Sequence, residues 1–335
     1  MGFGLNDPSC LRPGLTDRAT GPINGSVSEL FFDPVFLAHD AGEGHPECPA
    51  RLEAILKGLE PLGSGLPGRT RPCRPVELSV LYRVHEPRYV AHVEALSGSG
   101  GGMLDPDTAV SAGSFAAALA AAGAAVSAVE GVARGEFASA FCAVRPPGHH
   151  AMPSRGMGFC LFNNIAVAAA HAREALGIGR VLIVDWDAHH GNGTQAVFDE
   201  DPDVFYLSLH RYPHYPGTGS AAERGKGRAE GTKLNVPLAA GTGHDEFMRL
   251  LKGALAEVRE SFRPELVLVS CGFDGAEGDP LGGLALRPET YAEATLAVRE
   301  LARSCGHERI VSILEGGYDL DSLGDCARAH FGALP

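Results

Sequence analysis

The stretch RVLIVDWDAHHGNGT, residues 180–194, decides the expected fold. Its first half is a short run of β-branched and aliphatic residues, which is typical of a strand buried in a parallel sheet. Its second half changes to aspartate, histidine and glycine, the residues of a tight polar loop. A buried strand that ends in a cluster of titratable side chains predicts an α/β protein with a site at the end of that strand.

Five further aliphatic runs have the length and composition of buried strands. They cover residues 35–39, 139–144, 204–210, 265–271 and 309–315. Stretches with helical spacing of apolar residues alternate with them, at residues 49–60, 114–134, 162–176, 244–262 and 288–304. This alternation predicts a doubly wound α/β fold, in which helices flank a central, mostly parallel sheet.

The rest of the chain favours a single domain. Residues 1–27 contain Pro, Gly, Ser and Asn without apolar periodicity, so we expect an irregular N-terminal arm before one domain over residues 28–335. We find no signal-peptide pattern and expect no membrane span. The eight cysteines include no CxxC pair, which excludes a cysteine zinc knuckle and favours reduced thiols in a cytoplasmic protein.

The net charge of −13 argues against direct nucleic-acid binding, which needs clustered lysine and arginine. An acidic surface could steer a cationic substrate, but solubility alone explains it equally well. Arginine far outnumbers lysine, a bias typical of GC-rich bacterial genomes.

Polar and titratable residues follow four of the expected strands. Because parallel strands present their carboxyl ends at one edge of the sheet, these loops should meet there. Glycines in each loop permit tight turns and close approach. The four segments are RPPGHHA (145–151), DWDAHHGNGT (185–194), GFDGAEGDPLGG (272–283) and GGYD (316–319).

A catalytic zinc site is the first expectation for this edge. Asp187, His189 and Asp274 offer two carboxylates and one imidazole, and three protein ligands with an open position are typical of catalytic zinc. The D-x-H spacing places Asp187 and His189 on the same side of an extended segment.

Amide hydrolysis also needs a base, an acid and an oxyanion donor. The adjacent His149 and His150 could provide base and acid, with Asp185 and Asn192 as the partners that orient their rings. Asp185 would stabilise a positive charge on one ring better than neutral Asn192, which favours His150 as the proton shuttle. Tyr318 would donate a hydrogen bond to the developing oxyanion.

Together these segments resemble the histone deacetylase family, in particular its class II branch and the bacterial histone deacetylase-like amidohydrolases. The resemblance runs from about Val35 to the C-terminus. Asn192 stands where class I relatives carry aspartate. The carrying segments are GHPECPARLEAI (44–55), RPPGHHA (145–151), MGFCLFNN (157–164), VLIVDWDAHHGNGTQAVF (181–198), YLSLHRYPHYPGTG (206–219), LVLVSCGFD (266–274), GDPLGG (278–283) and LEGGYDL (314–320).

The resemblance implies the arginase–deacetylase fold, one zinc ion and a tunnel for an acylated lysine. It implies that Phe159 and Tyr215 form the walls of the tunnel and that the Gly158 carbonyl accepts a substrate amide. Leu281 occupies a rim position at which polyamine-selective relatives can carry glutamate, so it favours acyl-lysine. The tyrosine at position 318 implies true deacetylase activity, because some class IIa relatives have histidine there.

The resemblance also implies a structural potassium ion, held partly through main-chain oxygens. The matching positions are Asp185, Asp187, His189, Ser208 and Leu209. One departure concerns the rim loop GSGGGMLDPD (98–107), where the family often carries a carboxylate or serine that holds the substrate backbone. Glycines occupy that position here, and Asp105 and Asp107 are the nearest carboxylates.

Structural roles are expected for most other polar residues in these loops. We expect Glu277 and Asp279 to lie in a solvated turn, Glu315 to be structural and His190 to support a helix start or a ligand. A structural role and a place at the pocket mouth are equally favoured for His210 and His214. The remaining histidines are interpreted as structural: His39, His45, His85, His92, His171, His244, His307 and His330.

The residues leave several functions open. The favoured one is deacylation of acetyl-lysine in proteins or peptides, and the second is deacetylation of an acetylpolyamine or another acetylated metabolite. A catalytically weak acyl-lysine binding module would be expected to have lost Tyr318, a ligand or the histidine pair. An arginase-like ureohydrolase would need two manganese ions and further carboxylates where Asn192 and His190 stand.

Overall fold

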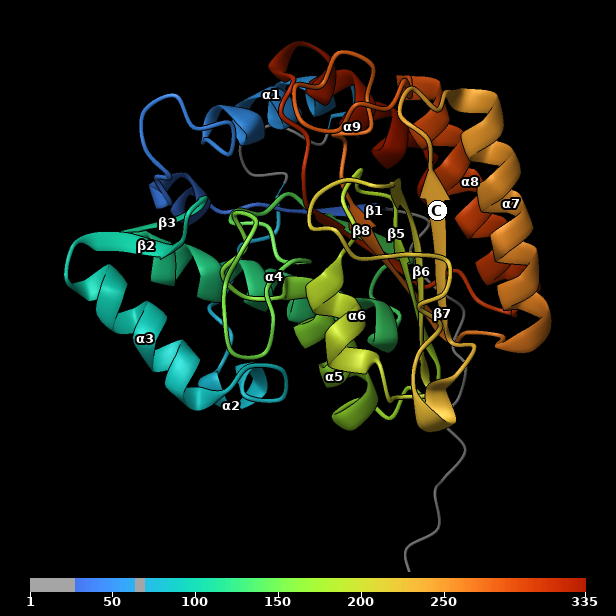
Figure 1. Cartoon of the computed structure of the whole chain (residues 1–335), viewed down its shortest axis with the longest axis horizontal. Helices are drawn as coiled ribbons and strands as arrows, with labels where there is room; N and C mark the ends of the chain where they lie inside the picture. The colour runs from blue at the N-terminus through green and yellow to red at the C-terminus, as the bar shows by residue number, and fades with distance from the viewer. Residues whose placement is uncertain (1–27, 64–69) are drawn as a thin grey trace, which may run out of the picture.

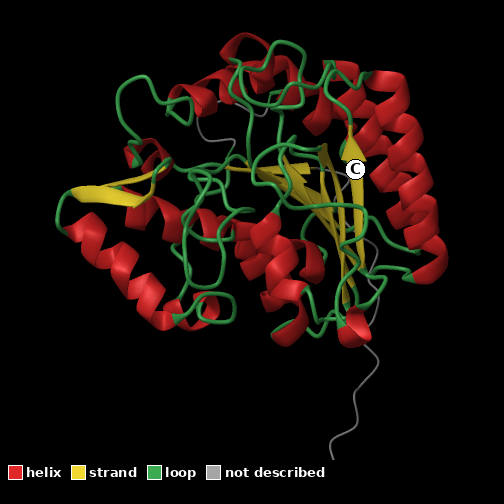
Figure 2. Ribbon diagram, viewed as in Figure 1, coloured by secondary structure: helices red, strands yellow, loops and turns green. Residues whose placement is uncertain are grey.

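The centre of the molecule is a seven-stranded parallel sheet (Figures 1 and 2). It is seen in a computed structural model that describes residues 28–63 and 70–335. The strand order confirms the predicted α/β fold. From one edge to the other the strands are β1 (Ser28–Phe31), β4 (Ser139–Cys142), β9 (Ile310–Leu314), β8 (Leu266–Cys271), β5 (Val181–Asp185), β6 (Val204–Arg211) and β7 (Lys233–Leu238).

Helices cover both faces of the sheet, which explains why its central strands are buried throughout and mostly apolar. Helices α4 (Ser114–Arg134), α5 (Asn164–Glu174) and α6 (Asn192–Phe198) lie on one face, whereas α7 (His244–Ser261) and α8 (Pro288–Ser304) lie on the other (Figure 1). Helix α9 (Leu320–Ala333) packs between α8 and α1 (Ala50–Leu59).

The predicted strand at residues 35–39 is wrong. Pro34–Ala38 forms a short 3-10 helix, η1, because Asp33 caps its start by accepting a hydrogen bond from the Val35 amide and Pro34 favours a first helical position. The edge strand is β1 instead, directly after the predicted arm. That arm, residues 1–27, lies outside the described residues.

Several short elements carry too little periodicity to be predicted. Strand β7 contains Pro237, which an edge strand tolerates because its outer side needs no partner. Strands β2 (Gly101–Asp105) and β3 (Thr108–Ser111) form an antiparallel hairpin out of the glycine-rich rim loop. Four helices were also missed, namely α2 (Leu78–Leu81), α3 (Pro87–Gly98), α6 and α9. The remaining 3-10 turns are η2 (Glu60–Leu62) and η3 (Gly227–Ala229).

Helix α4 bears on the expectation of no membrane span, because a span is first recognised by its length and its apolar composition. By length and composition α4 meets that criterion, but 72% of its apolar window is buried inside the protein. Its alanines pack closely against α5, β4 and β9. We therefore interpret α4 as a core helix.

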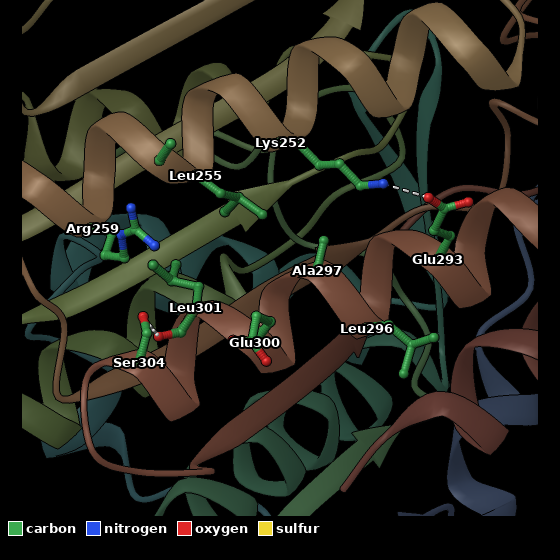
Figure 3. A pocket seen from close by; sticks show the side chains of 10 residues that line it. Lys252, Leu255, Arg259, Glu293, Leu296, Ala297, Glu300, Leu301 and Ser304 are labelled. Atoms are coloured by element: carbon green, nitrogen blue, oxygen red, sulfur yellow. Dashed lines mark hydrogen bonds and ion pairs between the residues drawn. The ribbon is translucent and has the colours of Figure 1, made fainter.

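A surface groove of about 380 Å³ lies between α7 and α8 (Figure 3). Leu255 and Leu301 give it an apolar floor, and an ion pair of 2.5 Å between Lys252 Nζ and Glu293 Oε1 crosses one end. None of the residues predicted to carry the chemistry lines this groove.

His85 links the start of α5 to the loop that follows the histidine pair, and it should make stability depend on pH. It is 1% exposed, its Nδ1–H donates to the Met152 carbonyl (3.1 Å), and its Nε2 accepts the Asn163 amide (2.8 Å). The bond to Asn163 requires a neutral ring, because Nε2 can accept a hydrogen bond only while it carries no proton. Burial lowers the pKa of His85 from 6.5 to about 4.

The unfolded chain therefore binds a proton that the folded chain does not, between pH 6.5 and about 4. The stabilisation by His85 is complete above pH 6.5, and about 3 kcal/mol of it is lost as the pH falls to 4. Urea unfolding at pH 7.0, 5.5 and 4.5 should show a shallower pH dependence for His85→Gln than for the wild type. Parallel pH curves would contradict this role.

Candidate active site

The predicted polar loops meet at the carboxyl edge of the sheet. Strand register explains this, because Asp185 at the end of β5 pairs with Ser208 of β6 and with Ser270 of β8, and Ser270 pairs with Ile313 of β9. Strands β5, β8 and β9 therefore end at nearly the same level, and the loop that follows each of them opens onto one site.

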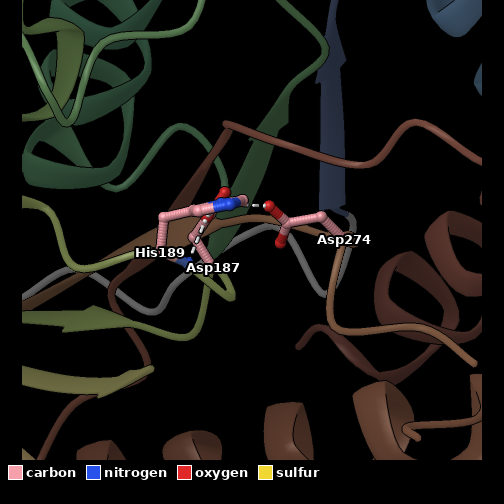
Figure 4. A group of neighbouring side chains, drawn as sticks. All are labelled: Asp187, His189 and Asp274. Carbon is pink, nitrogen blue, oxygen red and sulfur yellow. Dashed lines mark hydrogen bonds and ion pairs between the residues drawn. The ribbon is translucent and has the colours of Figure 1, made fainter. Parts of the chain in front are cut away.

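Asp187, His189 and Asp274 form a buried cluster that could hold a metal ion (Figure 4). One ligand atom from each lies within 4.8 Å of the others. His189 Nδ1 is 2.8 Å from Asp274 Oδ2 and 3.1 Å from Asp187 Oδ1. The second oxygens are held by backbone amides, Asp187 Oδ2 by Gly316 and Asp274 Oδ1 by Ala188, at 2.8 Å each. Such bonds orient metal ligands.

The charges of this cluster fit a divalent cation. Burial opposes protonation of His189, but Asp274 and Asp187 raise its pKa to about 10. Burial and the neighbouring Asp187 raise the pKa of Asp274 to about 7. Within the described part of the chain, neither carboxylate forms an ion pair with lysine or arginine. The cluster therefore attracts positive charge, which a proton supplies here and a divalent cation could supply in its place. Two carboxylates and one imidazole form a donor set that zinc accepts.

His149 is held by a carboxylate. Its Nδ1 lies 3.1 Å from Asp185 Oδ2, which also accepts the Tyr206 hydroxyl at 2.9 Å. The Asp187 amide donates to the other oxygen of Asp185 at 3.2 Å. Burial alone would lower the pKa of His149, but Asp187 and Asp185 raise it to about 10. This ring is therefore suited to carry a positive charge.

His150 is held by a neutral amide instead. Its Nδ1 lies 2.8 Å from Asn192 Oδ1, while Asn192 Nδ2 faces the sulfur atoms of Met152 (3.4 Å) and Met157 (3.5 Å). A thioether only accepts hydrogen bonds, so the amide must turn its NH₂ to the sulfurs and its oxygen to His150. The proton of His150 is thereby fixed on Nδ1, and Nε2 keeps its lone pair. Burial and the nearby His149 hold the pKa of His150 well below its usual value.

A pocket of about 210 Å³ leads to this chemistry. It contains every predicted tunnel residue and places them beside His150 and His189. Its lining residues are Asp107, His150, Gly158, Phe159, His189, His214, Tyr215, Leu281 and Tyr318. The Phe159 ring lies edge-on to Tyr318 at 5.8 Å, and the Tyr215 ring lies edge-on to His150 at 5.1 Å. Such an aromatic slot fits an extended alkyl chain.

Phe159 adopts an unusual backbone conformation to reach this position. Its φ is +67°, in the left-handed region that side chains other than glycine rarely occupy, and Gly158 before it has φ +58°. Two side chains secure the turn, because the Gly158 amide donates to Asp107 Oδ1 (3.2 Å) and the Phe159 amide donates to Thr108 Oγ1 (3.1 Å). Strain of this kind is found where a side chain must be aimed into a site.

The rim of the pocket therefore does carry a carboxylate, that of Asp107. The glycines at 98–102 leave no side chain there, but the turn between β2 and β3 brings Asp107 to the pocket, and Asp105 does not line it. Burial and Asp105 raise the pKa of Asp107. The sequence could not show this, because the hairpin decides which of the two aspartates reaches the pocket.

The structure decides between the two roles that the sequence left open for His210 and His214. His214 lines the pocket, stacks on His189 at 5.0 Å and donates from Nε2 to the Leu281 carbonyl at 2.9 Å. For His210 the alternative of a place at the pocket mouth is wrong, because the side chain is fully buried and bonds Ser208 and the Gly219 carbonyl. His190 is also buried and bonds Thr218 and Gln195, in agreement with a supporting role.

Other supporting residues were missed or misjudged from the sequence. Arg51 donates to the carbonyls of Gly317 (2.6 Å) and Glu315 (2.5 Å), and its guanidinium carbon lies 4.8 Å from the Tyr318 ring centroid. Burial opposes the charge of Arg51, but Tyr318 and Glu47 raise its pKa. The sequence carries a signal for this role, because Arg51 lies on the apolar face of the stretch PARLEAI (49–55), next to Leu52 and Ile55.

Glu315 is structural, as expected, but it acts at the site. Its Oε2 accepts the amides of Gly148 (2.7 Å) and His149 (3.0 Å), so it fixes the backbone that carries the histidine pair. The expectation that Asp279 lies in a solvated turn is wrong. Asp279 is 8% exposed and accepts four backbone amides, whereas Glu277 two residues earlier is exposed.

Comparison with known proteins shows the class to which this fold and site belong. The histone deacetylase domain family matches residues 45–334. A histone deacetylase-like amidohydrolase of Pseudomonas aeruginosa is 38% identical over 307 residues, which cover 86% of this chain and 81% of the relative. A probable deacetylase of Archaeoglobus fulgidus is 37% identical over 297 residues, covering 88% and 82%.

A solved structure agrees. The crystal structure of the HDA15 HD domain superposes with a TM-score of 0.86 at 40% sequence identity, covering 92% of this chain and 87% of that chain. The chain therefore belongs to the histone deacetylase family, whose members are hydrolases of acetyl amides.

Proposed function

We propose that the chain is a zinc-dependent deacetylase that acts on acetylated lysine in proteins or peptides. The observation that carries the proposal is the shared pocket, in which His150, Tyr318 and the His189 of the metal cluster line one aromatic slot. When bound by Asp187, His189 and Asp274, a zinc ion supplies Lewis-acid polarisation of the acetyl carbonyl and lowers the pKa of a water molecule.

The chain's own residues would divide the remaining work. His150, neutral and with its Nε2 lone pair free, accepts a proton from the attacking water and passes it to the departing amine. His149, paired with Asp185, provides positive charge beside the reaction centre. The Tyr318 hydroxyl, whose pKa burial raises well above its usual value, stays protonated and donates to the oxyanion.

The substrate assignment rests on the rim of the pocket. Leu281 lines it with an apolar side chain and adds no carboxylate for a second amine. Phe159 and Tyr215 suit the four methylenes of lysine, and Asp107 lies where a carboxylate could accept an amide N–H of the substrate backbone. Acetylpolyamines or other acetylated metabolites form the alternative class.

A substrate panel tests the assignment. The zinc-loaded protein should turn over an acetyl-lysine peptide with a higher kcat/KM than acetylputrescine, and varying the acyl chain on the same peptide would define the length that the slot accepts. A clear preference for acetylputrescine would move the protein to the second class. Absence of hydrolysis on every acetyl and trifluoroacetyl amide would favour a binding module.

Asp107→Asn should weaken binding of the peptide without affecting the chemical step. Loss of one charge-assisted hydrogen bond, about 1.5 kcal/mol, should raise KM for the acetyl-lysine peptide about tenfold with little change in kcat. The matched control is Glu94→Gln, an exposed carboxylate on α3, which packs against the same hairpin but does not line the pocket. An unchanged KM in the Asp107 variant would remove this residue from substrate recognition.

We also propose a potassium ion beside the site and a cytoplasmic location. Ser208 and Leu209 lie within β6, and Ser208 pairs with the buried Asp185, so main-chain and carboxylate oxygens are available near one another for a hard cation. All seven cysteines in the described ranges are free thiols, which suits a reducing compartment. For partners, we propose an acylated lysine or small amine, without direct nucleic-acid or membrane binding.

A further inference from the structure

Asp279 connects two loops that both contribute to the pocket. Its Oδ1 accepts the amides of Leu281 (2.9 Å) and Gly282 (3.2 Å), and its Oδ2 accepts those of Tyr318 (2.7 Å) and Asp319 (3.2 Å). A carboxylate can accept about four hydrogen bonds, so all of its capacity is used. Because the donors form two pairs, each oxygen holds one loop.

The Tyr318 loop depends on such side-chain contacts for its position. It joins β9 to α9 through Glu315–Asp319, a segment with no regular secondary structure. Arg51 holds the segment from one side through the carbonyls of Glu315 and Gly317. Asp279, 39 residues away in sequence, holds the amide of Tyr318 itself.

The other loop shapes the wall of the same pocket. Leu281 and Tyr318 both line it, and the Leu281 carbonyl accepts a hydrogen bond from His214, which stacks on His189. A single carboxylate therefore fixes the distance between this wall and the backbone of the tyrosine. An oxyanion donor is effective only within about 2.7–3.1 Å of the oxygen it stabilises, so a small displacement of Tyr318 should be costly.

We propose that Asp279 is a positioning residue that fixes Tyr318 against the Leu281 wall of the pocket and so sets the rate of the chemical step. The inference rests on the proposed function of Tyr318 as the oxyanion donor. It assigns a role in the reaction to a residue that touches neither substrate nor metal ligand and acts only through two loops.

Asp279→Asn is the first test, because it replaces one oxygen by an NH₂ group that must face backbone N–H donors. With an acetyl-lysine peptide as substrate, kcat should fall about 10-fold to 100-fold, while the zinc content stays at the wild-type level. The matched control is Glu277→Gln, which changes an exposed carboxylate of the same loop and should keep wild-type kinetics.

A double-mutant cycle separates positioning from general destabilisation. If Asp279 acts through the hydroxyl of Tyr318, the Asp279→Asn change should lower kcat less than twofold in the Tyr318→Phe background. An equal loss in both backgrounds would overturn the proposal, and so would wild-type kcat in the folded single variant. If Asp279→Asn does not fold, Asp279→Glu, which displaces both oxygens by one methylene, should give the same pattern.

Amide hydrogen exchange tests the contact without any assay of hydrolysis. Peptides that cover residues 279–284 and 316–320 should both exchange faster in Asp279→Asn than in Glu277→Gln, because the buried acceptor of their amides is lost. Wild-type protection in both segments would overturn the proposal. If the wild type shows this protection but hydrolyses no acetyl amide, the proposed function fails while the connection between the loops stands.

Discussion

Asp274→Ala is expected to yield a folded protein that retains no zinc and hydrolyses acetyl amides no faster than the uncatalysed reaction. Asp274 supplies one of three ligand atoms, and its carboxylate is fully buried. Two remaining ligands cannot hold the ion in the three-ligand geometry of a catalytic site. Elemental analysis after gel filtration, together with turnover of an acetyl-lysine peptide, provides the measurement.

The control for this variant is Glu277→Gln, which lies three residues further along the same loop and is exposed. It should keep one zinc ion per chain. A full zinc complement in Asp274→Ala would refute the ligand assignment. A wild-type content near two metal ions per chain would instead indicate an arginase-like centre.

Tyr318→Phe is expected to lower kcat about 10²-fold to 10³-fold, the cost of one lost oxyanion donor. KM and zinc content should change little, because the hydroxyl is not part of the metal cluster and the phenylalanine ring preserves the contacts with Phe159 and Arg51. Steady-state kinetics on the zinc-loaded variant give kcat and KM separately.

Tyr212→Phe is the matched control, because Tyr212 follows β6 near the site but does not line the pocket. It should hydrolyse the peptide at the wild-type rate. If Tyr318→Phe retained wild-type kcat, the oxyanion would have to be stabilised by the metal ion and the charge of His149 without the hydroxyl. The positioning role of Asp279 would then lose its basis.

Long, strongly patterned elements could be predicted from the sequence. The strand at 180–186 and the helices at 244–262 and 288–304 agree with β5, α7 and α8 to within about two residues at each end. Their apolar residues recur at the spacing of a strand or a helix over many residues. The prediction of a strand at residues 35–39 failed because an aliphatic run of five residues is too short to show such a period. Asp33 and Pro34 start a 3-10 helix there instead.

Those residues of the candidate site that directly follow a strand could be predicted from the sequence. His149, Asp187, Asp274 and Tyr318 each follow a buried strand, and parallel strands bring those ends together. The residues that support them could not be found in this way. Arg51 lies in a helix far from these loops in sequence, and its bonds to Glu315 and Gly317 depend on how α1 packs against α9.

The sequence by itself thus determined the α/β class and the meeting of Asp187, His189 and Asp274 with the histidine pair, because local periodicity and the direction of parallel strands suffice to place them. Tertiary structure alone decided which carboxylates become buried acceptors. Asp107 reaches the pocket because β2 and β3 pair as a hairpin. Asp279 accepts the amides of Leu281 and Gly282 in its own loop, and it is buried because the distant Tyr318 loop adds two more. Contacts of this kind join segments that no local pattern connects.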